Sequence, residues 1–216
     1  MSVARVGAHE LRDVLRRVRP FVLADRGGVE ADLVALTGVL LFADEGKLYA
    51  QAGDKHHFVI RQIPGVNEVE EGFVPAVVGV KEVDELIRSL RLADKESVVS
   101  VSHLLQLDTG VLTIQGGGME EVVPTMDIPP LFLSRLVPNL QGSGVPADYR
   151  NIFVVDPRIL KDVVPTGVRS EGMFLSYLPR HHQIAFAADE YEVGVVMLRY
   201  DASFEPLPAW NWDRAV

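Results

Sequence analysis

The chain has 216 residues, of which 48% are hydrophobic and 24% are charged, with a formal net charge of −9, a composition typical of a globular protein with one large or two small domains. It has no apolar run near the roughly 18 residues that span a bilayer, no signal-peptide core and no cysteine, so we expect a cytoplasmic protein without disulfides, thiolate metal sites or a cysteine nucleophile. The acidic charge argues against a general nucleic-acid coat but permits a local basic surface.

Residues 8–19 are predicted to form an amphipathic helix that stops at Pro20. Its apolar stripe follows the i, i+3, i+4, i+7 spacing and consists of Leu11, Val14, Leu15 and Val18. Three arginines, Arg12, Arg16 and Arg19, repeat a helical spacing on another face, and Arg17 lies beside them. A charged face of this kind is most often simply solvated, and the alternative is a surface that faces phosphate groups.

A β-hairpin is predicted within residues 36–58. Two strand-like runs, 36–42 and 47–52, flank a turn at Glu45 and Gly46, and a third short strand is expected at 58–63. In the second run Leu48 and Ala50 alternate with Tyr49 and Gln51. A compact polar turn, Gly-Asp-Lys-His-His, occupies residues 53–57.

The same order of elements recurs downstream. Residues 80–91 are predicted to be a second amphipathic helix, with a buried stripe of Val80, Val83, Ile87 and Leu90. Strands are expected at 97–104, 111–115 and 120–125. The triple glycine at 116–118 is interpreted as a hairpin turn and not as a phosphate cradle, because no helix start follows it. One helix and three strands thus occur twice, which indicates an internal repeat.

The rest of the chain predicts a linker and a third copy of this unit. Residues 127–150 are rich in proline and glycine, and their apolar side chains indicate a linker that packs on something. A strand at 151–155, a helix beginning at Asp156 and Pro157, and strands at 173–178, 183–187 and 192–200 follow. We therefore expect an α+β fold, with one domain at 1–127, a linker at 128–150 and a second, shorter domain at 151–216. Trp210 and Trp212 indicate a tail that docks.

Several of these stretches resemble the beta-type sliding clamp of bacterial replicative DNA polymerases. The family's hairpin and polar turn are similar to LTGVLLFADEGKLYAQAGDKHHF, and the stretch leading into its second helix is similar to GFVPAVVGVKEVDELIRSLR. The segment between its domains resembles MDIPPLFLSRLVP, and its last helix and closing strand resemble NIFVVDPRILKDVV and EVGVVMLR. The resemblance implies DNA-clamp-like repeats of one helix and an antiparallel sheet, joined into a ring with the helices facing duplex DNA.

The resemblance also implies a function and its residues. It implies a non-enzymatic processivity factor for DNA replication, without a cofactor or a membrane partner. This factor would be a ring-shaped homo-oligomer that binds DNA without regard to sequence and binds polymerase and clamp loader through short peptide motifs. The implied DNA-facing residues are Arg12, Arg16, Arg17, Arg19, Lys81, Arg88, Arg91, Arg158 and Lys161. The implied partner-peptide groove contains Lys55, His56, His57, Phe58, Pro130, Arg135, Leu136 and Met197. The family usually has glycine where Lys55 stands, arginine where His57 stands, and proline after the methionine that Met197 matches.

Other interpretations remain open. The family has six halves in each chain and about three are recognisable here, so a fourth is either reduced into 128–150 or absent. A non-ring interaction module with the clamp fold is one alternative. A small metal-dependent hydrolase is another, based on the pairs His56-His57 and His181-His182 with a carboxylate such as Asp54 or Asp189. Adjacent histidines in a strand point to opposite faces, however, and metal-binding spacings such as HExxH are absent.

Overall fold

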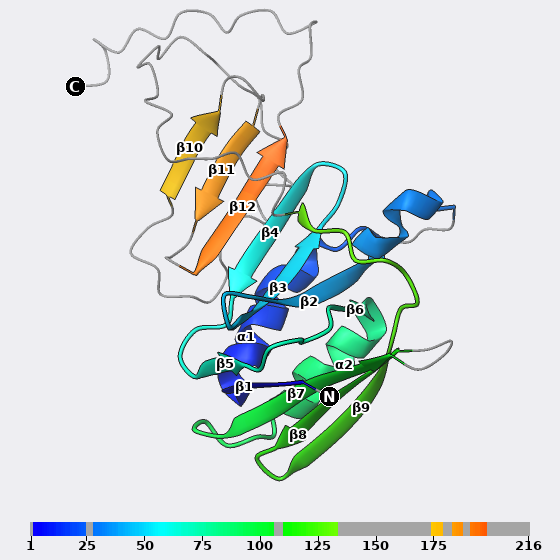
Figure 1. The fold of residues 1–216 in the computed structure, drawn as a ribbon. Helices are drawn as coiled ribbons and strands as arrows, with labels where there is room; N and C mark the ends of the chain where they lie inside the picture. Colours follow the sequence, from blue (N-terminus) through cyan, green and yellow to red (C-terminus); the bar gives the residue numbers. More distant parts are fainter. Residues whose placement is uncertain are drawn as a thin grey trace, which may run out of the picture.

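The computed structural model describes residues 2–24, 28–105, 110–133, 174–178, 183–187 and 191–197, which form two antiparallel sheets and two α-helices (Figure 1). The helices are α1 (Ala8–Val18) and α2 (Val80–Leu90), and two 3₁₀ segments are η1 (Arg19–Phe21) and η2 (Ala31–Thr37). The strands are β1 (Val3–Gly7), β2 (Gly38–Asp44), β3 (Lys47–Gly53), β4 (His57–Gln62), β5 (Asn67–Val69), β6 (Ala76–Gly79), β7 (Val98–Leu105), β8 (Gly110–Gly116), β9 (Met119–Thr125), β10 (Phe174–Leu178), β11 (Gln183–Ala187) and β12 (Glu192–Met197). No helix in the described part of the chain is long and apolar enough to cross a membrane.

The two repeat units exchange their first strands. Sheet A has the strand order β5-β1-β7-β8-β9, and sheet B has the order β10-β11-β12-β4-β3-β2-β6. Strand β1 precedes α1 but pairs with β7 of the second unit, whereas β6 precedes α2 but pairs with β2 of the first unit. The predicted α+β class with antiparallel sheets is confirmed. The two leading strands were not predicted, because such short segments show too little alternation.

The hairpin turn has a backbone geometry that Gly46 favours and Glu45 adopts. Glu45 and Gly46 have φ angles of +46° and +72°, and the flanking residues Asp44 and Lys47 pair directly. Positive φ at both central positions is the type I′ pattern, which matches the right-handed twist of paired strands. The hairpin predicted from the sequence is therefore confirmed, with β2 and β3 as its strands.

The main core lies between the two helices and the two sheets. The four predicted apolar residues of α1 are all buried in it. In α2 the buried residues are Val83, Leu86 and Leu90, while Val80 and Ile87 are only partly buried. The predicted stripe of α2 was therefore wrong by a small rotation. Leu86 was missed because apolar residues occur on more than one side of this helix, and only its packing decides which side is covered.

A second apolar cluster covers the opposite face of sheet B. Its fully buried members are Leu36, Leu40, Phe42, Phe58, Ile60, Val77, Leu133 and Val195. Strand β2 therefore faces apolar side chains on both sides, with Val39 and Leu41 in the main core and Leu40 and Phe42 in the second cluster. Burial on both faces explains why this strand is an almost continuous aliphatic run.

Strands β10–β12 extend sheet B beyond β4, as the yellow-to-orange arrows of Figure 1 show. Strand β12 pairs antiparallel with β4, with Val195 opposite Phe58. The three strands predicted at 173–200 are therefore present within their described limits. The predicted helix that begins at Asp156, the linker beyond Leu133 and the tryptophan tail lie outside the described residues. The division into domains 1–127 and 151–216 stays a prediction.

Candidate functional site

The two helices pack against each other and are joined by an ion pair. The Nε and Nη2 atoms of Arg19 in η1 donate to Oδ1 and Oδ2 of Asp84 in α2, at 3.0 and 2.9 Å. This hydrogen bonding raises the pKa of Arg19 above its usual value despite some desolvation. Both side chains are 43% exposed, so the pair lies at the surface of the helix layer.

The predicted basic residues of the helices differ in how much charge they present. Five of them are exposed, namely Arg16, Arg19, Lys81, Arg88 and Arg91. Within the described part of the chain, Arg16, Lys81 and Arg91 have no ion-pair partner. The Nε atom of Arg88 donates to the Asp84 carbonyl oxygen at 3.1 Å, and its Nη2 atom lies 4.0 Å from Oε1 of Glu85. Both side chains are exposed, so this long contact compensates the Arg88 charge only weakly.

Arg12 shares its charge with a neighbour. Its Nη2 atom lies 2.8 Å from Oδ1 of Asp13 and 3.1 Å from Nδ1 of His9, and its side chain is only 15% exposed. The helix surface is therefore mixed, with basic residues that face solvent beside others that are already paired with carboxylates.

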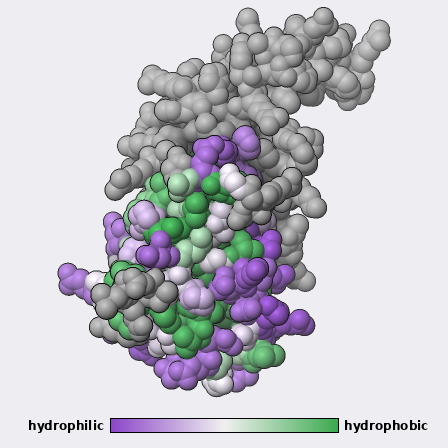
Figure 2. Space-filling view, turned by 90° about the vertical axis from the view of Figure 1, so that its right-hand side faces the viewer, coloured by the Kyte–Doolittle hydropathy of each residue, from purple (hydrophilic) through white to green (hydrophobic). Residues whose placement is uncertain are grey.

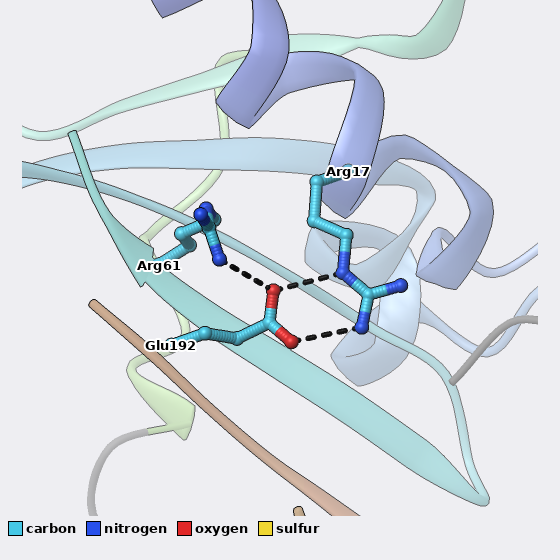
Figure 3. Close-up of polar contacts among 3 residues, drawn as sticks. All are labelled: Arg17, Arg61 and Glu192. Carbon is cyan, nitrogen blue, oxygen red and sulfur yellow. Dashed lines mark hydrogen bonds and ion pairs between the residues drawn. The ribbon is translucent and has the colours of Figure 1, made fainter. Parts of the chain in front are cut away.

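Arg17 has a different place from the DNA-facing one that the family resemblance implied. Its Nε and Nη2 atoms donate to both carboxylate oxygens of Glu192, each at 2.8 Å, and its guanidinium carbon lies 5.5 Å from the centroid of the Phe21 ring. Arg61 Nη1 donates to the same carboxylate at 3.0 Å (Figure 3). The Glu192 side chain has no exposed surface. The assignment of Arg17 to a DNA-facing surface is thus corrected, because its charge is used to attach β12 to α1.

This buried triad of Arg17, Arg61 and Glu192 was missed by sequence reasoning. Arg61 and Glu192 are directly opposite each other in the β4–β12 pairing. Arg17 is 175 positions from Glu192 in the sequence, and no local spacing relates them. Only a prediction that β12 pairs with β4, in this register, would have found the carboxylate.

The polar turn after β3 is organised by Asp54. Its Oδ1 atom accepts hydrogen bonds from the backbone N–H of His56 at 2.6 Å, the backbone N–H of His57 at 2.9 Å and the Nδ1 of His57 at 2.9 Å. Burial raises the pKa of the Asp54 carboxyl, but these hydrogen bonds and the His57 charge together outweigh it and hold the pKa below its usual value. The turn is therefore held in one shape by its own aspartate.

The predicted groove residues of this turn divide into two groups. Lys55 and His56 are exposed, and Lys55 Nζ lies 3.4 Å from Oε1 of Glu30. His57 and Phe58 are buried, and the His57 ring lies 4.9 Å from the Phe21 ring. The turn is polar, as its sequence indicates, but its last residue, His57, is buried. His57 is the first residue of β4 and its ring packs near Phe21, whereas His56 belongs to the bend before the strand.

The start of the linker lies against this turn. Leu133 belongs to the same apolar cluster as Phe58 and Val195, and a Cβ atom built on Gly53 would lie 2.8 Å from Leu133 Cδ1. Pro130 is exposed on the same segment, and Met197 is the final residue of β12, with its backbone opposite Gln183. The other predicted residues, Arg135, Leu136, Arg158 and Lys161, lie outside the described residues.

Comparison with known proteins identifies the architecture. No protein-family model matches the chain, and no curated protein matches its sequence. The structure is similar to that of a putative DNA polymerase III beta subunit from Eubacterium rectale, with a TM-score of 0.64 and 13% identity over 95% of this chain and 67% of that chain. A DNA polymerase sliding clamp from Pseudomonas aeruginosa has a TM-score of 0.64 and 12% identity over 92% and 67%. The chain has the sliding-clamp fold.

A Helicobacter pylori beta clamp bound to a DNA ligase peptide is also similar, with a TM-score of 0.61 and 12% identity over 96% of this chain and 68% of the clamp. The chain therefore corresponds to about two thirds of the length of these sliding-clamp structures, and identities this low establish the fold alone. The resemblance of its sequence to clamps is confirmed at the level of the fold.

The clamp-fold chain shows no metal centre in its described part, where no three histidine or acidic residues are grouped to hold an ion. Ser102 and His103 do not form a nucleophile and base either. His103 Nδ1 lies 3.2 Å from the Val74 carbonyl oxygen, in the segment between β5 and β6, and its Nε2 lies 3.1 Å from Thr125 Oγ1 of β9, so both ring nitrogens have hydrogen-bond partners. The hydrolase interpretation gains no support from these residues, and His181, His182 and Asp189 lie outside the described ones.

Exposed apolar residues are scattered over the surface. Figure 2 shows hydrophilic and hydrophobic residues intermixed over the coloured part of the face that it draws. Among the most exposed large apolar residues are Leu92, Leu105 and Val122, which belong to three different segments. Large apolar side chains that are exposed singly are normal on a protein surface and do not by themselves indicate a binding site.

Proposed function

We propose that this chain is the subunit of a DNA sliding clamp, a ring-shaped homo-oligomer that encircles duplex DNA and tethers a polymerase and other partners to it. The observation that carries the proposal is the sliding-clamp fold with Arg16, Lys81, Arg88 and Arg91 exposed on two helices that pack side by side. Phosphate contacts by such residues are independent of base sequence, as a moving ring requires. The role is mechanical and needs neither catalysis nor a cofactor.

The proposed DNA-facing surface consists of those four residues, together with Arg12 and Arg19, whose charges are shared with Asp13 and Asp84. Arg158 and Lys161 of the predicted third helix belong to the same proposal. Elsewhere acidic residues prevail, since the chain has a formal net charge of −9. An acidic exterior would repel DNA from the outside of the ring.

The ring would form by head-to-tail pairing of sheet edges. In the described part of the chain, β5 and β9 are the edges of sheet A, and β10 and β6 are the edges of sheet B. Edge strands present unpaired backbone groups to a neighbouring chain, and a head-to-tail contact that closes produces a ring. In this arrangement 1–127 and 151–216 would act as two domains of each subunit.

Partners would bind at the surface where the turn at 53–58, the linker from Pro130 and the end of β12 meet. The clamp from Helicobacter pylori is bound to a DNA ligase peptide, and short peptides of this kind are the partners that we propose for this chain. An apolar base made of Phe58 and Leu133 with a polar margin made of Lys55 and His56 is the usual composition of a peptide site.

The DNA-binding part of the proposal is tested by charge reversal. The triple variant Arg16→Glu, Lys81→Glu and Arg91→Glu should lose retention on nicked circular DNA, because it replaces exposed cations with anions at the proposed phosphate-facing surface. The salt dependence of the remaining binding should also decrease, by about 0.9 in the logarithmic slope for each lost phosphate contact.

A matched control separates this surface from net charge. Arg5 is exposed on β1, directly opposite Ser100. It lies between Ala4 and Val6 of the main core, so its side chain is on the other face of sheet A from the helices. Arg5→Glu changes the charge by the same amount as the single substitution Arg16→Glu, so these two variants are compared with each other. Arg16→Glu should weaken retention on DNA, and Arg5→Glu should not. Equal retention by the triple variant and the wild type, with native mass unchanged, would disprove the assigned surface.

A non-ring interaction module with the same fold is the second candidate. It is favoured by the pairing of Arg12, Arg17 and Arg19 with carboxylates, which weakens the positive charge of the helix surface. The native mass with and without nicked circular DNA distinguishes the two. A closed oligomer retained on the circle supports the clamp, and a monomer at high micromolar concentration supports the module.

A further inference from the structure

Gln51 connects sheet B to the first residues of the linker. It lies in β3 and is 2% exposed. Its Nε2 atom donates to the Leu131 carbonyl oxygen at 2.6 Å, and its Oε1 atom accepts from the Leu133 backbone N–H at 2.8 Å. A carboxamide carries a donor and an acceptor side by side, so this single side chain pairs with the linker backbone as a neighbouring strand would.

The linker segment is anchored at its other end as well. The backbone N–H of Met126 donates to the Val77 carbonyl oxygen of β6 at 2.8 Å. Between the two anchors, the Phe132 ring lies edge-on to the Phe42 ring at 5.6 Å. Residues 126–133 are thus held across this face of sheet B by a backbone hydrogen bond at one end, by the Gln51 side chain at the other and by apolar packing between them.

The anchored segment places Leu133 against the polar turn. The absence of a side chain at Gly53 permits this approach, because a Cβ atom there would lie 2.6 Å from Phe58 Cβ and 2.8 Å from Leu133 Cδ1. Gly53 is the last residue of β3, two positions after Gln51. The amide anchor and the space for Leu133 therefore come from the same few residues of one strand.

We propose that Gln51 is a positioning residue for the partner-peptide groove: it holds residues 131–133 in place, so that this wall of the groove is formed before a peptide binds. The inference rests on the proposed function and names the residue that pre-organises the site. The ligand class is a short extended peptide with apolar side chains, because the neighbouring surface holds exposed Leu131 and partly buried Phe132, which packs against the same apolar cluster as buried Phe58. A wall that is already ordered lowers the entropic cost of binding.

The test uses Gln51→Leu, which has a similar size but can form neither hydrogen bond. Gln51→Asn, which keeps the amide but shortens its reach, is the second variant in case the first does not fold. The matched control is Gln62→Leu on β4, because Gln62 accepts a hydrogen bond from the Tyr49 hydroxyl at 3.2 Å and belongs to the same sheet. Two quantities are measured on the full chain: hydrogen–deuterium exchange of residues 126–133, and affinity for the DNA ligase peptide bound by the Helicobacter pylori clamp.

The Gln51 variants should exchange the Leu133 amide faster and bind the peptide about tenfold more weakly, as expected for the loss of two hydrogen bonds that order the wall. Gln62→Leu should match the wild type in both. Unchanged exchange in the Gln51 variants would overturn the anchoring role. Faster exchange with unchanged affinity would overturn the role in the groove. A wild type that does not bind the peptide would instead overturn the partner site itself, and this failure is recognised because it precedes any substitution.

Discussion

The replacement Glu192→Gln tests the buried triad most directly. The Glu192 carboxylate accepts three hydrogen bonds, at 2.8, 2.8 and 3.0 Å, from two guanidinium groups that are themselves only 11% and 13% exposed. Glutamine has nearly the same shape but no charge, and its NH₂ group would face a guanidinium donor. The substitution therefore removes the Glu192 charge from beside two guanidinium groups, Arg17 and Arg61, that are themselves largely buried.

The expected cost follows from this burial. Removing one partner of a buried, hydrogen-bonded ion pair costs about 3–5 kcal/mol, because the remaining charge stays desolvated. The matched control is Asp84→Asn, which breaks the pair with Arg19, also held by two hydrogen bonds but with both side chains 43% exposed. An exposed pair contributes about 0–1 kcal/mol, so the control should change stability little.

Urea denaturation followed by circular dichroism measures both variants, with the midpoint and the slope fitted separately. Glu192→Gln should lower the free energy of unfolding by several kcal/mol, which corresponds to a decrease in Tm of about 2–4 °C for each kcal/mol in a chain of this size. Asp84→Asn should shift Tm by less than about 4 °C. Equal, small effects of the two substitutions would refute the conclusion that the triad attaches β12 to the rest of sheet B.

Two further outcomes are expected. Burial raises the pKa of the Asp54 carboxyl, but its hydrogen bonds lower this pKa by more, so the folded-state pKa lies below the unfolded-state value of about 3.9. The Asp54 carboxylate therefore stabilises the fold above about pH 3.9, and this stabilisation is lost as the pH falls through the folded-state pKa. The difference in unfolding free energy between wild type and Asp54→Asn should therefore be widest near neutral pH and decrease below about pH 4; a difference independent of pH would contradict it. Gly116 has a φ angle of +136°, and a Cβ atom there would lie 2.6 Å from the Val98 carbonyl oxygen. Gly118 has a φ angle of +80° but open space around it, so Gly118→Ala should cost about 1–2 kcal/mol from the backbone conformation alone. Gly116→Ala should lower Tm clearly more than Gly118→Ala, and equal losses would show that the contact with β7 is unimportant.

Much of this fold is determined by interactions between residues that are close in the sequence. The stripe of α1 follows from a 3.6-residue period, and the hairpin turn follows from two residues that tolerate or favour positive φ. The alternation of Leu48 and Ala50 with Tyr49 and Gln51 predicted correctly that they lie on different faces of sheet B, with Leu48 and Ala50 in the main core. These features require no knowledge of the rest of the chain, so the sequence alone was sufficient to predict them.

The composition of the candidate site was decided by the tertiary structure. Gln51 meets the linker 80 positions away, and Arg17 meets Glu192 after 175 positions, so neither contact has a local signal. Both depend on which strands pair and in which register, and a shift by one residue would turn Glu192 to the opposite face of its strand. The family resemblance implied that Arg17 would face DNA, and the pairing of β12 with β4 instead brings a buried carboxylate to it.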